Sequence, residues 1–120
     1  MTNDLTHDLM THEQRALLLA NGARTAAGED IDPYPVLKLF TPDGAATWLL
    51  TELDPEDPDI AFGLADLGMG FPELGSVSLS EINAVRGRMA LPIERDLYFE
   101  ADKPLSAYAK EARAHGTIQA

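Results

Sequence analysis

A chain of 120 residues has the length of one ordinary domain and is long enough to bury a single hydrophobic core. Hydrophobic residues make up 45% of it, no window approaches eighteen uninterrupted apolar residues, and cysteine is absent. This composition excludes a transmembrane helix, disulfides and cysteine-ligated zinc. The opening residues, MTNDLTHDLMTHEQ, have neither a basic start nor an apolar segment, so we expect no secretory signal and a cytoplasmic location.

The charge of the chain is unevenly distributed. The formal net charge is −11, and no Lys or Arg occurs between Leu39 and Val85. Nucleic-acid binding needs cationic side chains that neutralise phosphates, so we expect no direct contact of this segment with nucleic acid. The acidity either only keeps the protein soluble or, if the carboxylates gather on a shared exterior, forms a surface for a basic partner. The acids of this segment are Asp43, Glu52, Asp54, Glu56, Asp57, Asp59, Asp66, Glu73 and Glu81.

The first ten residues are polar and lack periodicity, so we expect residues 1–10 to form a disordered tail. A helix is predicted to follow over residues 11–22. Thr11 and Gln14 have the spacing of a capping box, in which each side chain bonds to the backbone of the other residue. Asn21-Gly22 is typical of a helix C-terminus.

Strands are predicted next, at residues 36–40, 47–53 and from Ile60 onward, with a short fourth strand at 76–78. The turn TPDG, residues 41–44, separates the first two strands, because proline and glycine supply the backbone conformations of a tight turn. Short links between consecutive strands indicate antiparallel pairing.

A second helix is predicted to begin at the box SLSE, residues 78–81, and to end at Gly87. A last strand is expected at 97–100 and a closing helix over 103–116, with Pro104 in its first turn. The fold class is therefore α+β: residues 11–116 form a single domain, an antiparallel sheet of four to five strands packed by two or three helices.

The acidic hairpin can be placed on this sheet. If Leu53 pairs with Ile60, then Glu52 lies opposite Ala61 and Asp66 lies opposite Thr47. Because side chains alternate along a strand, Trp48, Leu50 and Glu52 would share one face. Trp48 and Phe62 are expected in the core.

Two interpretations of the hairpin remain open. The sequence LTELDPEDPDI, residues 50–60, predicts either a solvated turn or a partner-binding surface formed by Glu52, Asp54, Glu56, Asp57 and Asp59. A calcium loop of the EF-hand type is excluded, because counting from Asp54 places Pro58, Asp59 and Ala65 where that loop needs an oxygen ligand, glycine and glutamate.

Candidate chemistry is sparse elsewhere. Glu52, Asp66 and Glu73 are weak metal candidates, because a curved sheet could bring three carboxylates together around a divalent ion. Surface or capping roles are the alternative for all three. The histidines have no partners at ligand spacing, and no serine lies in a nucleophile motif. We therefore assign no catalytic residue, no cofactor-binding residue and no cofactor.

Several motifs together resemble one family. The segments LKLF (37–40), TWLLTEL (47–53), FGLADLG (62–68) and PELGSVSLSEI (72–82) look like the DUF2958 family, and the resemblance runs from about Glu13 to Tyr108. It implies a small bacterial protein of unknown function, often carried on plasmids and integrative elements beside conjugation and antirestriction genes.

Three hypotheses follow from these observations. The chain is expected to be a non-enzymatic module that binds a basic protein partner, in the setting of mobile DNA. The alternatives are a structural subunit with no charge-specific role, and a metal-assisted hydrolase or metal-binding regulator built on Glu52, Asp66 and Glu73.

Overall fold

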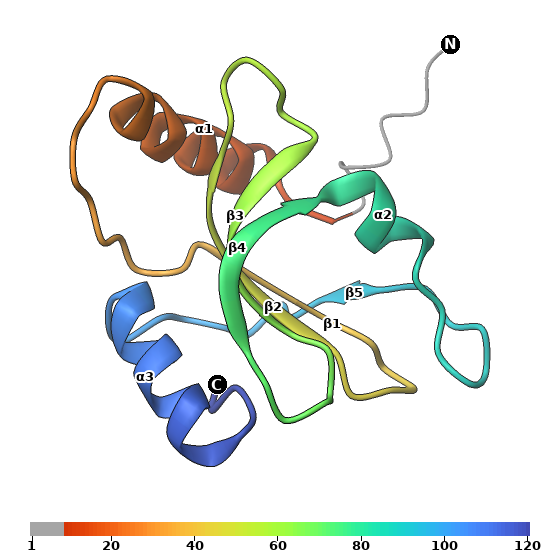
Figure 1. Ribbon diagram of the computed structural model, residues 1–120. Helices are drawn as coiled ribbons and strands as arrows, with labels where there is room; N and C mark the ends of the chain where they lie inside the picture. The colour runs from red at the N-terminus through yellow and green to blue at the C-terminus, as the bar shows by residue number, and fades with distance from the viewer. Residues whose placement is uncertain (1–8) are drawn as a thin grey trace, which may run out of the picture.

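One antiparallel sheet forms the centre of the molecule, and three helices lie against it in the computed structural model (Figure 1). The structure describes residues 9–120. The predicted α+β class is confirmed. The strands are β1 (Leu37–Phe40), β2 (Thr47–Leu53), β3 (Ile60–Asp66), β4 (Glu73–Ser78) and β5 (Glu94–Arg95), and the helices are α1 (His12–Ala26), α2 (Leu79–Ala84) and α3 (Leu105–His115).

The strand order is β4-β3-β2-β1-β5, so the first four strands follow one another across the sheet and β5 closes the β1 edge. The predicted pairing of β2 with β3 is confirmed from Thr47, opposite Asp66, as far as Leu50, opposite Gly63. Beyond Leu50 the register shifts by one residue at a β-bulge.

Compared with strict alternation of side chains, the bulge moves the residues that follow it to the opposite face of the sheet. Leu53 joins the core that contains Trp48 and Leu50, so its neighbour Glu52 lies on the opposite face of the sheet. Glu52 is paired with Phe62 rather than with Ala61. The prediction that Glu52 shares a face with Trp48 and Leu50 is therefore wrong, because an extra residue on one strand cannot be read from side-chain alternation.

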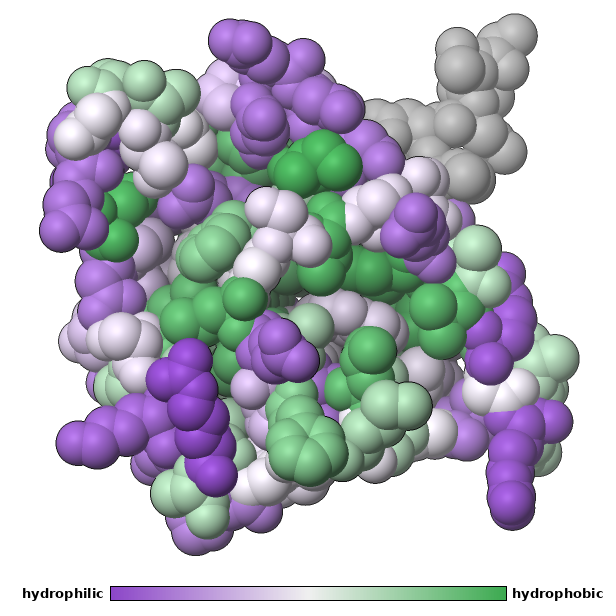
Figure 2. Space-filling model, in the orientation of Figure 1, coloured by the Kyte–Doolittle hydropathy of each residue, from purple (hydrophilic) through white to green (hydrophobic). Residues whose placement is uncertain are grey.

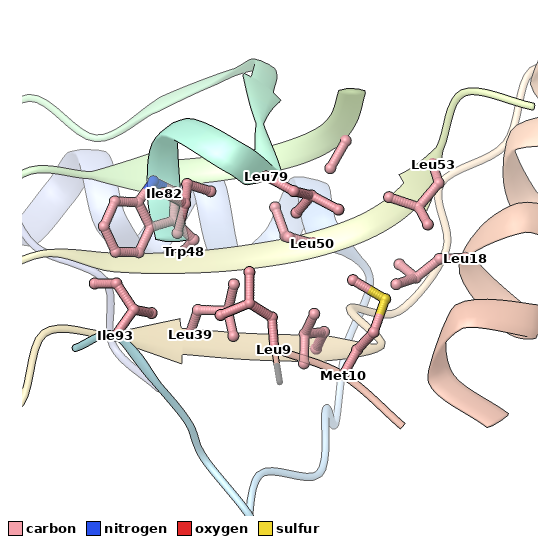
Figure 3. Close-up of a cluster of buried hydrophobic side chains, with 12 residues drawn as sticks. Leu9, Met10, Leu18, Leu39, Trp48, Leu50, Leu53, Leu79, Ile82 and Ile93 are labelled. Carbon is pink, nitrogen blue, oxygen red and sulfur yellow. The ribbon is translucent and has the colours of Figure 1, made fainter. Parts of the chain in front are cut away.

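The main core lies on the face covered by α2. Figure 3 shows Leu50 and Leu53 of β2 beside Leu18 of α1 and Leu79 of α2, so that both helices bury apolar side chains against one strand. Burial of this apolar surface is the main favourable term for folding. The members of this core are Leu9, Met10, Leu18, Leu37, Leu39, Trp48, Leu50, Leu53, Ala61, Leu79, Ile82 and Ile93.

A smaller core lies on the other face, where α3 covers Leu49 and Leu64 with Leu105, Tyr108, Ala109 and Ala112. The helix ends at Gly116, whose φ of 77° gives the expected left-handed cap. Phe62 lies on this same face but outside the smaller core, and 37% of its surface is exposed. The prediction that Phe62 is a core residue is wrong, because the face is only partly covered.

Helix α1 continues four residues beyond its predicted end. Its N-terminal capping box is confirmed: Gln14 N donates to Thr11 Oγ1 (3.0 Å) and Thr11 N to Gln14 Oε1 (2.9 Å). The pair Asn21-Gly22, read as a terminator, instead faces the end of β2. Asn21 Nδ2 donates to the Thr51 carbonyl oxygen at 2.9 Å, and the buried Gly22 lies against the backbone of Leu53.

Other boundaries also differ from the predictions. The expected disordered tail falls mostly on residues outside the described part of the chain, but its last two members, Leu9 and Met10, are buried in the main core. Strand β4 begins at Glu73, three residues before its predicted start, and α2 ends at Ala84 rather than at Gly87. The last strand, β5, lies before the predicted 97–100.

Candidate functional site

The β2–β3 turn forms an acidic projection at the end of the sheet. Asp54, Glu56 and Asp57 are exposed there, and we call these three residues the acidic tip. Asp54 Oδ1 accepts from Glu56 N at 2.9 Å, and Asp57 N donates to the Asp54 carbonyl oxygen at 3.2 Å. Pro55 and Pro58 restrict the backbone further. Figure 2 shows this turn as a hydrophilic projection above a region of apolar residues on the face that β4 crosses.

Asp59, predicted to belong to the same acidic surface, has a structural role. Its carboxylate accepts from Ser78 Oγ at 2.7 Å, from Ser80 N at 2.9 Å and from Ser80 Oγ at 3.0 Å. These donors stand at the start of α2, so Asp59 ties the hairpin to that helix. The hydrogen bond from Ser78, reinforced by those from Ser80, lowers the pKa of Asp59 below its ordinary value of 3.8.

A lowered carboxyl pKa predicts a pH dependence of stability. The contribution of Asp59 is complete above the ordinary pKa and is lost as the pH falls through the lower pKa of the folded state. Asp59→Asn should therefore reduce the free energy of unfolding by about 1 kcal/mol at pH 7 and by less at pH 3. Urea unfolding at both pH values measures the difference, with Asp57→Asn as the exposed control. An equal loss at both pH values would contradict the assignment.

Glu52 projects from β2 on the side of the sheet where Phe62 lies. Its Oε2 accepts from Thr25 Oγ1 near the end of α1, at 3.2 Å. No ion pair between residues of the described chain includes Glu52, and Arg24, which precedes Thr25, pairs with Glu29 (Nε to Oε1, 3.0 Å). The bulge and the extended α1 together place a half-buried carboxylate between helix and sheet.

The structure does not bring Glu52, Asp66 and Glu73 together. Glu52 and Asp66 lie at opposite ends of the β2–β3 pair, and Glu73 lies opposite Ala65, so it faces away from Asp66. Within residues 9–120, no three His, Cys, Asp or Glu side chains are grouped closely enough to hold a metal ion. The hydrolase hypothesis has no shared site in this geometry.

Asp66 instead holds the end of the chain in place. Only 3% of its surface is exposed, and its carboxylate accepts from Gly68 N at 2.8 Å and from Ile118 N at 3.0 Å. Asp43 likewise accepts from Met89 N at 2.6 Å, which fixes the loop before β5. The expectation that the acids of this segment share one exterior is wrong for Asp66, because this side chain is buried and bound by backbone amides.

A cavity of about 290 Å³ opens beside Glu52. The pairing of Glu52 with Phe62, and of Phe62 with Ser76, places these three side chains in one row across β2, β3 and β4. The end of α1 forms the opposite wall. The sequence alone missed Thr25, Phe62 and Ser76 as members of a site, because only the bulge brings Glu52 into their row. The lining residues are Gly22, Thr25, Ala26, Glu52, Asp54, Pro55, Ile60, Ala61, Phe62 and Ser76.

A second cavity, of about 380 Å³, lies beside α3 and contains charged groups that bind one another. Lys103 Nζ lies 3.0 Å from Glu111 Oε1 and 4.3 Å from the ring centre of Tyr108. The Tyr108 hydroxyl donates to Asp102 Oδ1 at 3.0 Å and, with Lys103, lowers the pKa of Asp102. This network stabilises the start of α3 and places the single cation Lys103 between two carboxylates, those of Asp102 and Glu111.

Every helix in residues 9–120 is too short or too polar to cross a membrane. The fold and the exposed turn define a small α+β protein in which a five-stranded antiparallel sheet carries an acidic hairpin tip. The chain belongs to the DUF2958 family, described as a protein of unknown function, whose family model matches residues 9–119. That match confirms the resemblance found in the sequence. No curated protein and no solved structure matches the chain.

Proposed function

We propose that this DUF2958 member is a non-enzymatic protein-binding module whose acidic tip contacts a basic surface of a partner protein. The observation that supports the proposal is the state of Asp54, Glu56 and Asp57: all three are exposed, and their hydrogen bonds remain within the turn. The turn therefore presents negative charge on a constrained backbone, which reduces the entropy lost on binding.

Charge balance supports the same proposal. The ion pairs between described residues join Arg24 with Glu29, Lys38 with Asp96, and Lys103 with Asp102 and Glu111, all outside the Leu39–Val85 segment. The acidic tip thus keeps its charge. A concentrated charge of one sign accelerates association with a surface of the opposite sign and makes binding weaken as salt rises.

The partner class follows from this charge. Proteins that act on nucleic acid carry cationic surfaces that neutralise phosphates, so they are the first candidates. The setting on mobile elements, which the family resemblance implies, would suit the same class, and we expect the encounter to occur in the cytoplasm. The chain itself, with a net charge of −11, would be repelled by a duplex.

Charge reversal at the acidic tip tests the proposal. The double variant Glu56→Lys, Asp57→Lys should lose at least tenfold in affinity for a partner captured from host lysate, because two contacts of opposite charge become repulsive. Capture at low and high salt, followed by titration of the purified partner, measures the change. Wild-type binding should weaken between about 50 and 500 mM salt.

The matched control is a charge reversal elsewhere on the surface. Glu100→Lys and Glu13→Lys change the net charge by the same amount at exposed positions outside the turn, and should retain most of the affinity. If the Glu56→Lys, Asp57→Lys variant captures the partner as well as wild type does, or if both double variants lose affinity equally, the acidic tip is not the contact surface. Normal function of a tip-neutralised chain would favour a structural subunit instead.

A further inference from the structure

The cavity beside Glu52 has two walls of different character. Ala26, Pro55, Ile60, Ala61 and Phe62 supply the apolar side chains of the lining, and the carboxylates of Glu52 and Asp54 supply its charge. No cationic residue belongs to the lining, all of which lies within the described part of the chain. A site with this composition fits a ligand that is apolar along its length and positive at its end.

Part of the apolar lining, Phe62, lies on an uncovered region of the sheet. Helix α3 covers Leu49 and Leu64, but Phe62 and Leu74 on the same face are each 37% exposed. Figure 1 shows α1 and α3 at opposite ends of this side of β3 and β4. Contiguous exposed apolar surface that is rimmed by polar groups is typical of binding sites.

Both carboxylates have binding capacity left. An ionised carboxylate has about four lone-pair positions, whereas Glu52 accepts only from Thr25 Oγ1 and Asp54 only from Glu56 N among the side-chain bonds of the described chain. Glu52 is half-buried, and a charge in that position is stabilised by a partner of opposite sign. Arg24 is already engaged by Glu29.

Size limits the ligand further. Pockets for cofactors and drug-sized molecules span about 300 to 1,000 Å³, and this cavity of about 290 Å³ falls just below that range. One long side chain suits it better than a nucleotide does. Lys and Arg place an aliphatic stem along apolar surface while the charged end remains near polar groups, and a cation also interacts favourably with an aromatic ring.

We infer that this cavity is the receptor for a single Lys or Arg side chain of the partner, with Phe62 against its stem and Glu52 against its charge. The inference rests on the proposed protein-binding function and adds a specificity pocket to it. The acidic tip would attract a basic surface in general, whereas the cavity would select a protruding cationic side chain.

The test is a titration of the full chain, observed through its backbone amides by NMR, with the peptide Gly-Gly-Arg-Gly-Gly. The control peptide replaces arginine by citrulline, which keeps the shape and removes the charge. Saturable shifts are expected at Thr25, Phe62 and Ser76 with the arginine peptide, and citrulline should bind about fivefold more weakly or not at all. Equal binding of both peptides would overturn the inference.

Two variants locate the site. Glu52→Gln keeps an acceptor for Thr25 and should weaken the arginine peptide about fivefold, while Glu73→Gln removes an exposed charge outside the cavity and should leave binding unchanged. Ser76→Tyr, a substitution that suits an exposed strand position, should block the opening. Shifts centred on Asp57, or indifference to Glu52→Gln, would show that the cavity is not the receptor.

The outcomes separate this inference from the proposed function. In one outcome, charge reversal at the acidic tip abolishes partner binding while Glu52→Gln leaves the affinity for the arginine peptide unchanged. That result would support the protein-binding function and contradict the assignment of the cavity. If the affinity for the peptide depends on Glu52 but charge reversal at the acidic tip changes no partner's binding, the assignment of the cavity is supported and the proposed function is contradicted.

Discussion

Gly22→Ala is expected to lower the melting temperature of the protein by roughly 10 °C, although alanine is the better helix former. In a helix interior, the higher helix propensity of alanine alone would stabilise the folded protein by about 1 kcal/mol. Gly22 lies against β2, however, and a Cβ atom at this position would be 1.7 Å from the Leu53 carbonyl oxygen. Helix and strand must separate to relieve this overlap, which costs about 3 kcal/mol.

The control for this prediction is a glycine with space around it. A Cβ at Gly75 of β4 would meet no atom within 4 Å, so Gly75→Ala should leave the melting temperature nearly unchanged. Thermal unfolding followed by circular dichroism measures both variants. A Gly22→Ala protein as stable as wild type would show that α1 does not dock on Leu53 as described.

Asp66→Ala should reduce the free energy of unfolding by about 3 kcal/mol, because it removes a buried carboxylate and leaves the part-buried amides of Gly68 and Ile118 without this acceptor. The segment after α3 should detach first, since Ile118 is held to the sheet by this carboxylate. Hydrogen exchange at the Ile118 amide would report that detachment, and denaturant unfolding would report the total loss.

Glu73→Ala is the matched control for Asp66→Ala. Both residues were candidates for the same metal site, but Glu73 is exposed on the edge strand, and its removal should cost less than about 0.5 kcal/mol. Asp66→Asn keeps one oxygen acceptor, so its loss in free energy of unfolding should lie between those of Asp66→Ala and Glu73→Ala. Equal costs for Asp66→Ala and Glu73→Ala would contradict the buried anchoring role.

Local patterns were sufficient to predict most of the sheet. The TPDG turn between β1 and β2 and the short links between consecutive strands predicted β2 and the first half of its antiparallel pairing with β3, because these features depend on neighbours in the chain. The capping boxes and Gly116 predicted helix ends for the same reason. The two-residue strand β5 could not be predicted, because it forms only where β1 offers a free edge.

The site depends on features that local patterns do not contain. Gly22 was taken for a helix terminator, although its role is to let α1 approach a strand about thirty residues away in the sequence. The acids looked alike in sequence, yet Asp59 caps α2, Asp66 is buried, and Glu52 faces a cavity. The role of each carboxylate is decided by the hydrogen-bond donors that the tertiary fold brings beside it.

The bulge after Leu50 gives β2 one residue more than the facing part of β3, because Thr51 has no partner in the ladder. Deleting Thr51 would leave Glu52 opposite Phe62 and Leu53 opposite Ala61 on their present faces. Straightening the strand with every residue kept would instead turn the Glu52 carboxylate inward among leucines and expel Leu53 into water. Family members that lack the extra residue should therefore keep a polar and then an apolar residue at the two positions that follow, and other insertions and deletions should accumulate in the connecting turns.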